Sequence, residues 1–159
     1  MLDLDRSLRQ QLLAALKGGQ AHTTFEHAIA DFPFEQTGVR PPGQPHSAWE
    51  LLEHLRIAQE DIVRFSQSAG HQSPKWPEGY WPAHQAPADE AEWNRSIAAF
   101  QADLDEFCHL VEDEKQDVHA PFPWGEGQNL LREALLIVDH NAYHLGELVL
   151  VRRTLGIWE

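Results

Sequence analysis

The sequence predicts an all-α fold, an up-down-down-up four-helix bundle formed by a single domain that covers residues 1–159. Four segments repeat apolar residues at intervals of three or four, the period of an amphipathic helix. Stretches rich in proline and glycine separate these segments, and no segment shows the alternation typical of strands. A chain of 159 residues is long enough for one domain with its own hydrophobic core.

The first half of the chain is expected to form two of these helices. Residues 4–30 begin the bundle, with a break at Gly18-Gly19 and a second short piece over residues 24–30. Residues 32–45 contain four prolines and are expected to form a long crossover loop. The second helix should begin after Ser47, because Ser47 and Glu50 have the spacing of a capping box, and it should end near residues 69–70.

The second half is expected to contain an aromatic, proline-rich loop and two further helices. Residues 71–87 hold four prolines and several aromatic residues, which indicates an ordered loop rather than a linker. A third helix should start near Asp89 and reach about residue 111, and residues 121–127 are too rich in proline and glycine for a helix. The last helix should cover residues 130–155, between the N-cap Asn129 and the stop at Gly156. The aromatic residues of the loop are Trp76, Tyr80 and Trp81.

Composition narrows the possible functions. The formal charge is −13, from 12 basic and 25 acidic residues, which argues against binding to nucleic acid or to an anionic membrane. The acidic start and the short apolar runs predict neither a signal peptide nor a membrane span, so we expect a cytoplasmic protein. The single cysteine, Cys108, excludes an internal disulfide and is interpreted as a half-buried structural residue.

Three of the ten histidines have the pattern of metal ligands. His140 and His144 are four residues apart, so both rings lie on one side of the last helix, one turn from each other. His54 lies on the apolar face of the second helix and can supply a third nitrogen from across the core. The alternative is three core histidines that are satisfied by hydrogen bonds. The other histidines are assigned to solvated loops (His46, His71, His84 and His119) or to packing and surface roles (His22, His27 and His109).

Two other classes of metal site do not fit this pattern. A zincin needs a glutamate directly after the first histidine, where this chain has Asn141. A di-iron bundle needs Glu-x-x-His pairs on two helices, and Ile137 stands where the glutamate would be. A mononuclear site with three neutral histidines remains, which leaves open positions for water or substrate.

Two carboxylates are candidate catalytic residues beside this site. Asp61 follows His54 by seven residues, and Glu147 follows His144 by three, so each returns to the face of the histidines. Either carboxylate could hold a water molecule, act as a general base or orient an imidazole N–H. The alternatives are an ion pair with a neighbouring helix for Glu147 and a surface acid at the end of the bundle for Asp61.

Three motifs resemble the DinB-like family of four-helix-bundle metalloproteins. They are residues 47–55 (SAWELLEHL) with Asp61-Ile62, residues 139–147 (DHNAYHLGE) and residues 152–158 (RRTLGIW), and the resemblance extends over nearly the whole chain. It implies that His54, His140 and His144 bind one divalent ion, with zinc or nickel as the first candidates and iron or manganese as further ones. Relatives often have glutamine at the position of Glu147.

The resemblance also implies a range of activities. Some members resemble thiol S-transferases or isomerases that use a low-molecular-weight thiol such as bacillithiol, mycothiol or glutathione, and others are described as metal-dependent hydrolases. The chain is therefore expected to activate a thiol or water toward small electrophilic molecules, with the aromatic loop and Trp124 at the mouth of the pocket. The rival interpretation is a non-catalytic metal-binding stress-response protein, so whether the chain is an enzyme stays open.

A homodimer is expected as well. The last helix is apolar on more of its circumference than one core face requires, and the resemblance points the same way. The additional apolar residues are Leu131, Leu135, Leu145, Val149 and Leu150.

Overall fold

The computed structural model describes residues 4–158, and all regular elements in this range are helices. The all-α prediction is therefore confirmed. None of these helices combines the length and the apolar character that a membrane span requires. The elements are α1 (Leu4–Lys17), α2 (Phe25–Ile29), the 3-10 helix η1 (Phe34–Gln36), α3 (Ala48–Gln67), the 3-10 helix η2 (Glu78–Tyr80), α4 (Glu90–Glu112) and α5 (Leu130–Leu155).

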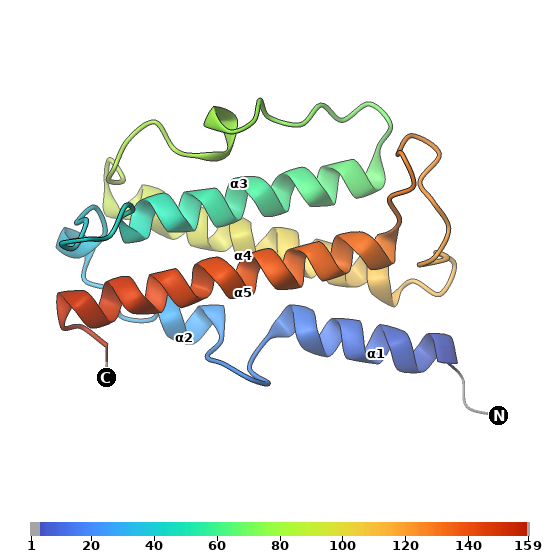
Figure 1. Cartoon of the computed structure of the whole chain (residues 1–159), viewed down its shortest axis with the longest axis horizontal. Helices are drawn as coiled ribbons and strands as arrows, with labels where there is room; N and C mark the ends of the chain where they lie inside the picture. The colour runs from blue at the N-terminus through green and yellow to red at the C-terminus, as the bar shows by residue number, and fades with distance from the viewer. Residues whose placement is uncertain (1–3, 159) are drawn as a thin grey trace.

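The helix directions follow the predicted up-down-down-up order. In Figure 1, α1 and α5 run one way along the bundle, while α3 and α4 run the other way. Since α3 and α4 are parallel, residues 68–89 must return along the whole length of the bundle, so the crossover is the aromatic, proline-rich segment itself. Residues 32–45, which were expected to be the crossover, instead reverse the chain at one end, because α2 has already carried the chain to that end.

Helix boundaries follow local hydrogen bonds. The predicted capping box of α3 is present: the Glu50 amide donates to Ser47 Oγ over 3.2 Å, and the Ser47 amide donates to Glu50 Oε2 over 2.8 Å. Asn129 caps α5 by accepting from the Arg132 amide over 2.9 Å. Gly156 ends α5 in the left-handed conformation at φ 73°, where a Cβ atom would be strained. These ends match the predicted ones, apart from α3, which ends at residue 67.

The core has two clusters along the bundle axis. One joins α2, the first half of α3 and the second half of α5, and the other joins α1, the second half of α3 and the first half of α5. His54 precedes Leu55 of the first cluster, while His140 follows Ile137 of the second. The histidines therefore lie where the two clusters meet. The first cluster includes Leu51, Leu52, Leu55, Phe100 and Leu148, and the second includes Ile62, Val63, Phe107, Val111 and Ile137.

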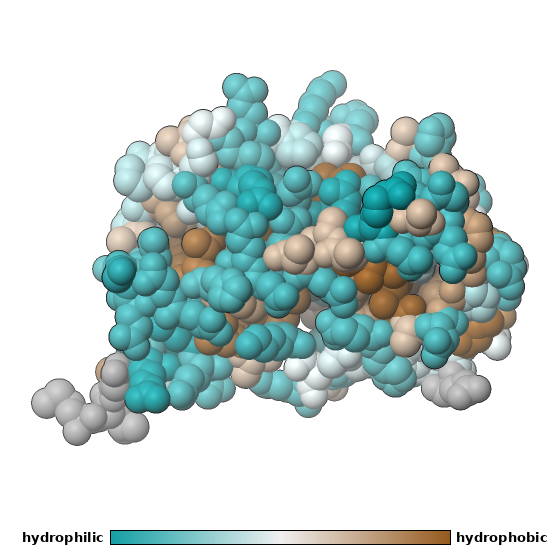
Figure 2. Space-filling view, turned by 180° about the vertical axis from the view of Figure 1, so that it is seen from behind, coloured by the Kyte–Doolittle hydropathy of each residue, from teal (hydrophilic) through white to brown (hydrophobic). Residues whose placement is uncertain are grey.

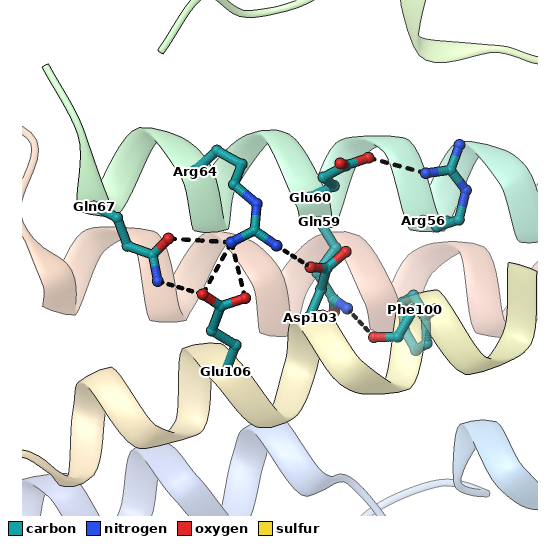
Figure 3. A network of polar contacts seen from close by, with 8 residues as sticks. All are labelled: Arg56, Gln59, Glu60, Arg64, Gln67, Phe100, Asp103 and Glu106. Carbon is teal, nitrogen blue, oxygen red and sulfur yellow. Dashed lines mark hydrogen bonds and ion pairs between the residues drawn. The ribbon is translucent and has the colours of Figure 1, made fainter. Parts of the chain in front are cut away.

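Polar contacts join the parallel pair α3 and α4. Figure 3 shows Arg64 of α3 reaching two acidic residues of α4, Asp103 at 2.7 Å and Glu106 at 2.8 Å. Burial raises the pKa of Asp103, and the Arg64 guanidinium opposes this shift. The contacts set the register of the two helices.

A buried glutamine connects three helices beside the histidines. Gln59 of α3 is 1% exposed, and its amide group donates to the Phe100 carbonyl of α4 over 2.6 Å, as Figure 3 shows. Its oxygen accepts from the side-chain amide of Asn141 on α5 over 2.9 Å. Because Asn141 directly follows His140, this contact places that part of α5 against α3.

Candidate metal centre

The structure brings the three predicted histidines together. His54 reaches from α3, while His140 and His144 reach from α5. The Nε2 atom of His54 is 3.1 Å from Nε2 of His144 and 3.1 Å from Nε2 of His140. Within residues 4–158, this is the group of histidine, cysteine or acidic residues whose ligand atoms converge, all within 4.8 Å of one another.

Hydrogen bonds at the other ring nitrogens determine which atoms carry lone pairs. Nδ1 of His54 is 2.8 Å from the Tyr80 carbonyl oxygen, which only accepts, so Nδ1 must carry the proton. Nδ1 of His144 is 2.7 Å from Oε2 of Glu147, and an ionised carboxylate likewise only accepts. In the neutral rings, Nε2 of both histidines is therefore unprotonated, and two lone pairs face each other across 3.1 Å.

This arrangement fits a bound cation. Two facing lone pairs repel each other unless a positive centre lies between them. Nitrogen ligands about 2.0–2.1 Å from a tetrahedral zinc ion lie about 3.3 Å from each other, close to the separation found here. Three imidazole nitrogens are a donor set that suits zinc, nickel, copper and iron.

Burial keeps the rings neutral, which is the form that binds a metal. Burial, together with the neighbouring His144 and His54, lowers the pKa of His140 to about 4. Burial likewise lowers the pKa of His144 to about 4, and it also lowers the pKa of His54. The contact between His144 and Glu147 is therefore a hydrogen bond from a neutral ring to a carboxylate, although its length of 2.7 Å would also suit an ion pair.

Trp81 from the crossover covers His54. The two rings stack with centroids 4.0 Å apart and planes 2° from parallel. The other face of Trp81 stacks on His46 at 4.1 Å. His46 is thus half-buried beside the site rather than solvated in a loop, and the prediction for it was wrong. The sequence could have indicated this position, because His46 directly precedes Ser47, the N-cap of α3, and His54 lies in the second turn of that helix.

The other aromatic residues predicted to line the mouth of the pocket, Trp76, Tyr80 and Trp124, do not all lie at the site. Tyr80 lies at the site, and Trp76 packs against it at 5.5 Å while remaining 71% exposed. Trp124 instead donates its indole N–H to the Phe65 carbonyl over 2.8 Å. Phe65 is eleven residues beyond His54 on α3, a rise of about 16 Å. Trp124 therefore packs at the far end of α3, away from the histidines.

Asp61 is joined to the crossover. Its Oδ2 accepts from the Tyr80 hydroxyl over 2.6 Å, and its Oδ1 lies 2.6 Å from Nε2 of His71. Its side chain is 12% exposed, so it is not the surface acid of the alternative interpretation. His71 was assigned to a solvated loop, but it is partly buried against Asp61, because the loop folds back onto α3. Burial and the bond to Asp61 raise the pKa of Tyr80 to about 12, so its hydroxyl stays a donor.

Cys108, His84 and His119 lie in the environments that were expected for them. Cys108 on α4 is 3% exposed, and burial raises the pKa of its thiol to about 11. This confirms the structural interpretation, since the reactive form is the thiolate. His84 and His119 are exposed, as predicted for loop residues.

Comparisons with known proteins identify the family. Neither the curated proteins nor the solved structures include a significant match to this chain. The sequence model of the DinB superfamily, a metal-binding helical family, matches residues 19–148, a range that contains α2 to α4, most of α5 and all three histidines. The chain therefore belongs to the DinB superfamily.

Proposed function

We propose that this chain is a metal-dependent enzyme that uses one divalent ion, held by His54, His140 and His144, to activate a thiol or water toward a small electrophilic molecule. The observation that carries this proposal is the pair of unprotonated Nε2 atoms of His54 and His144 at 3.1 Å. Such a pair is costly to bury without a cation. Zinc or nickel is the first candidate for the metal, followed by iron or manganese.

The surrounding residues have distinct tasks in this proposal. The Tyr80 carbonyl and Glu147 hold the Nδ1 protons of His54 and His144, which keeps both Nε2 atoms turned toward the centre. Trp81 covers one face of His54 and excludes water from it. A divalent ion bound there would lower the pKa of a water or thiol in an open position toward neutrality.

Glu147 bears on the choice between an enzyme and a non-catalytic metal-binding stress-response protein. A structural site is usually closed by a fourth protein ligand, whereas a catalytic site keeps a position open. Glu147 is the acidic residue that could supply a fourth ligand, but its Oε2 accepts from Nδ1 of His144, on a different edge of the ring from Nε2. This arrangement favours the open site, and hence the enzyme.

Metal content per chain tests the site. We expect one equivalent of divalent metal in the wild-type protein after dialysis, measured by mass spectrometry. His144→Ala should lose most of it, whereas His84→Ala and His119→Ala, which alter exposed histidines, should retain it. A full equivalent in His144→Ala, or none in the wild type, would contradict the three-histidine site. Protein purified from its own host without added metal would identify the native ion.

Turnover tests the reaction. We expect the metal-loaded protein to convert aryl halides or epoxides only when a low-molecular-weight thiol is added, and His144→Ala to be inactive. Cys108→Ser should keep full turnover, because the thiol is buried on α4 and none of the three ligands comes from that helix. Loss of turnover in Cys108→Ser with the metal still bound would make Cys108 the nucleophile. A metal-loaded protein without turnover would favour the stress-response alternative.

A further inference from the structure

A continuous chain of contacts leads from Asp61 to the candidate metal centre. Asp61 accepts from the Tyr80 hydroxyl over 2.6 Å, and the carbonyl of the same tyrosine accepts from Nδ1 of His54 over 2.8 Å. The next residue, Trp81, stacks on the His54 ring at 4.0 Å. Asp61 thus holds Tyr80, and Tyr80 and the adjacent Trp81 in turn contact His54 on the same helix.

Distance separates Asp61 from the reacting atoms. It follows His54 by seven residues on α3, a rise of about 10 Å. Both of its carboxylate oxygens are engaged, one by Tyr80 and one by His71. Because both oxygens are hydrogen-bonded and Asp61 is not among the converging candidate ligands, Asp61 can influence the site only through Tyr80 and His71.

The crossover depends on these contacts for its position. It spans residues 68–89, and its only regular element in that range is η2, one turn that ends at Tyr80. His71 and Tyr80 lie nine residues apart on this segment, and both bind the same carboxylate. Asp61 therefore fastens the segment to α3 at two points, one before η2 and one at its last residue, directly before Trp81.

We propose that Asp61 is a positioning residue for the metal centre: it fixes the Tyr80 carbonyl, which in turn fixes the tautomer and orientation of His54. This inference rests on the proposed function in one respect, that His54 binds a metal ion. Without Asp61, the Tyr80 side chain loses its partner on α3, so the Tyr80 carbonyl is held less firmly and the His54 proton can occupy either nitrogen. The tautomer protonated at Nε2 cannot bind a metal through that atom.

The first test is metal affinity in charge-matched variants. Asp61→Ala and Glu60→Ala each remove one carboxylate from adjacent positions of α3, and the Glu60 carboxylate accepts from Arg56 of the same helix. We expect Asp61→Ala to raise the dissociation constant for zinc about 10–100-fold, the usual effect of losing a group that orients a ligand. Glu60→Ala should change it less than about threefold, because it removes the same charge and a contact within α3 but no contact with the crossover. Zinc competition with a chromophoric chelator provides the measurement.

Two further variants separate hydrogen bonding from charge and from folding. Tyr80→Phe keeps the ring and the backbone but removes the bond to Asp61, so it should also weaken zinc binding about tenfold. Asp61→Asn keeps an oxygen that accepts from Tyr80, so it should recover most of the affinity lost in Asp61→Ala. An Asp61→Asn variant as weak as Asp61→Ala would overturn the hydrogen-bond mechanism.

The second test reads His54 directly in the metal-free protein. Nitrogen NMR of the imidazole rings should report His54 protonated at Nδ1 in the wild type and in Glu60→Ala, and a mixture of tautomers in Asp61→Ala and Tyr80→Phe. Unchanged tautomers together with equal zinc affinities would overturn the positioning role, even if the wild type binds metal. If the wild type binds no metal, the proposed function fails, while the tautomer comparison still decides the role of Asp61.

Discussion

Two of the three imidazoles at the candidate metal centre, those of His54 and His144, are each held by a specific neighbour. His54 donates to a backbone carbonyl, and His144 donates to Glu147, which comes from the same helix three residues later. The second contact needs no tertiary structure, since residues three apart share one face of a helix. The Glu147 side chain is 31% exposed, so its carboxylate stays solvated while it holds the ring.

Removing this carboxylate should weaken metal binding. We expect Glu147→Ala to raise the zinc dissociation constant about 10–100-fold, because His144 loses the partner that orients it. Glu147→Gln should stay close to wild type, since its amide oxygen can accept the same proton. Glu126→Ala, which removes an exposed carboxylate from a loop, is the control for net charge. Equal affinities for Glu147→Ala and Glu126→Ala would contradict this role.

The metal-free protein should lose stability in mildly acidic solution. The folded-state pKa of His140 and of His144 is about 4, below the value of about 6.5 for an unfolded chain. The unfolded chain therefore binds more protons between these values, so stability is complete above pH 6.5 and falls as the pH drops toward 4. Each histidine contributes a slope of up to about 1.4 kcal/mol per pH unit.

Urea denaturation with a chelator present, at pH 7.0 and pH 5.5, measures this slope. The double variant His140→Gln/His144→Gln should flatten the dependence between the two pH values, and His84→Gln should leave it unchanged, because His84 is exposed. A double variant with the wild-type slope would show that other groups cause the acid sensitivity.

At the scale of elements, three contacts hold the helices that carry the histidines. Arg64 joins α3 to α4, Gln59 joins α3 to both α4 and α5, and the crossover lies against α3 through Asp61. Of these, Gln59 is the one whose partner directly neighbours a candidate ligand, since Asn141 follows His140. The relative position of His54 and His140 therefore depends on the amide pair of the buried Gln59 and the half-buried Asn141.

Replacing Gln59 should destabilise the bundle. Gln59→Met keeps the volume but leaves the buried Phe100 carbonyl and the half-buried Asn141 amide without their partner, which should cost about 1–3 kcal/mol. Gln67→Met, on the exposed part of the same helix, should change the free energy of unfolding by less than about 0.5 kcal/mol. Chemical denaturation of both variants compares them. Equal effects would contradict a stabilising role for the contacts of Gln59.

At the scale of the whole molecule, apolar exposure is uneven. The face that Figure 2 shows, on the α4 side of the bundle, is mostly hydrophilic, with its hydrophobic residues in small separate areas. On α5, Leu135 is 55% exposed, Tyr143 67% and Leu150 46%. Leu145, which was expected to join this surface, is 6% exposed and belongs to the core of the chain itself.

We propose that this exposed side of α5 pairs two copies of the chain. Light scattering at tens of micromolar should give the mass of a dimer, and Leu135→Glu/Leu150→Glu should give the mass of a monomer, because charged residues oppose burial of the paired surface. Leu4→Glu is the control, since Leu4 is 77% exposed on α1. A monomeric wild type at this concentration would contradict the proposal.

Helix boundaries and the histidine pair were predictable because both depend on short separations in sequence. The capping box at Ser47 and Glu50 and the N-cap at Asn129 involve residues three apart. His140 and His144 share a face through the period of the helix alone. The apolar stripe around His54 indicated that its ring would point inward, and the two stripes meet in the core.

The tertiary structure decided which loop residues join the site. The crossover carries His71, Tyr80 and Trp81 back along α3, and their partners there are ten to twenty-seven residues away in sequence. An irregular segment has no period that predicts which of its side chains meets a helix, so the same composition is compatible with a solvated loop. Only packing against α3 turned Asp61 from a possible surface acid into an anchor, and turned the Tyr80 carbonyl into the acceptor that fixes His54.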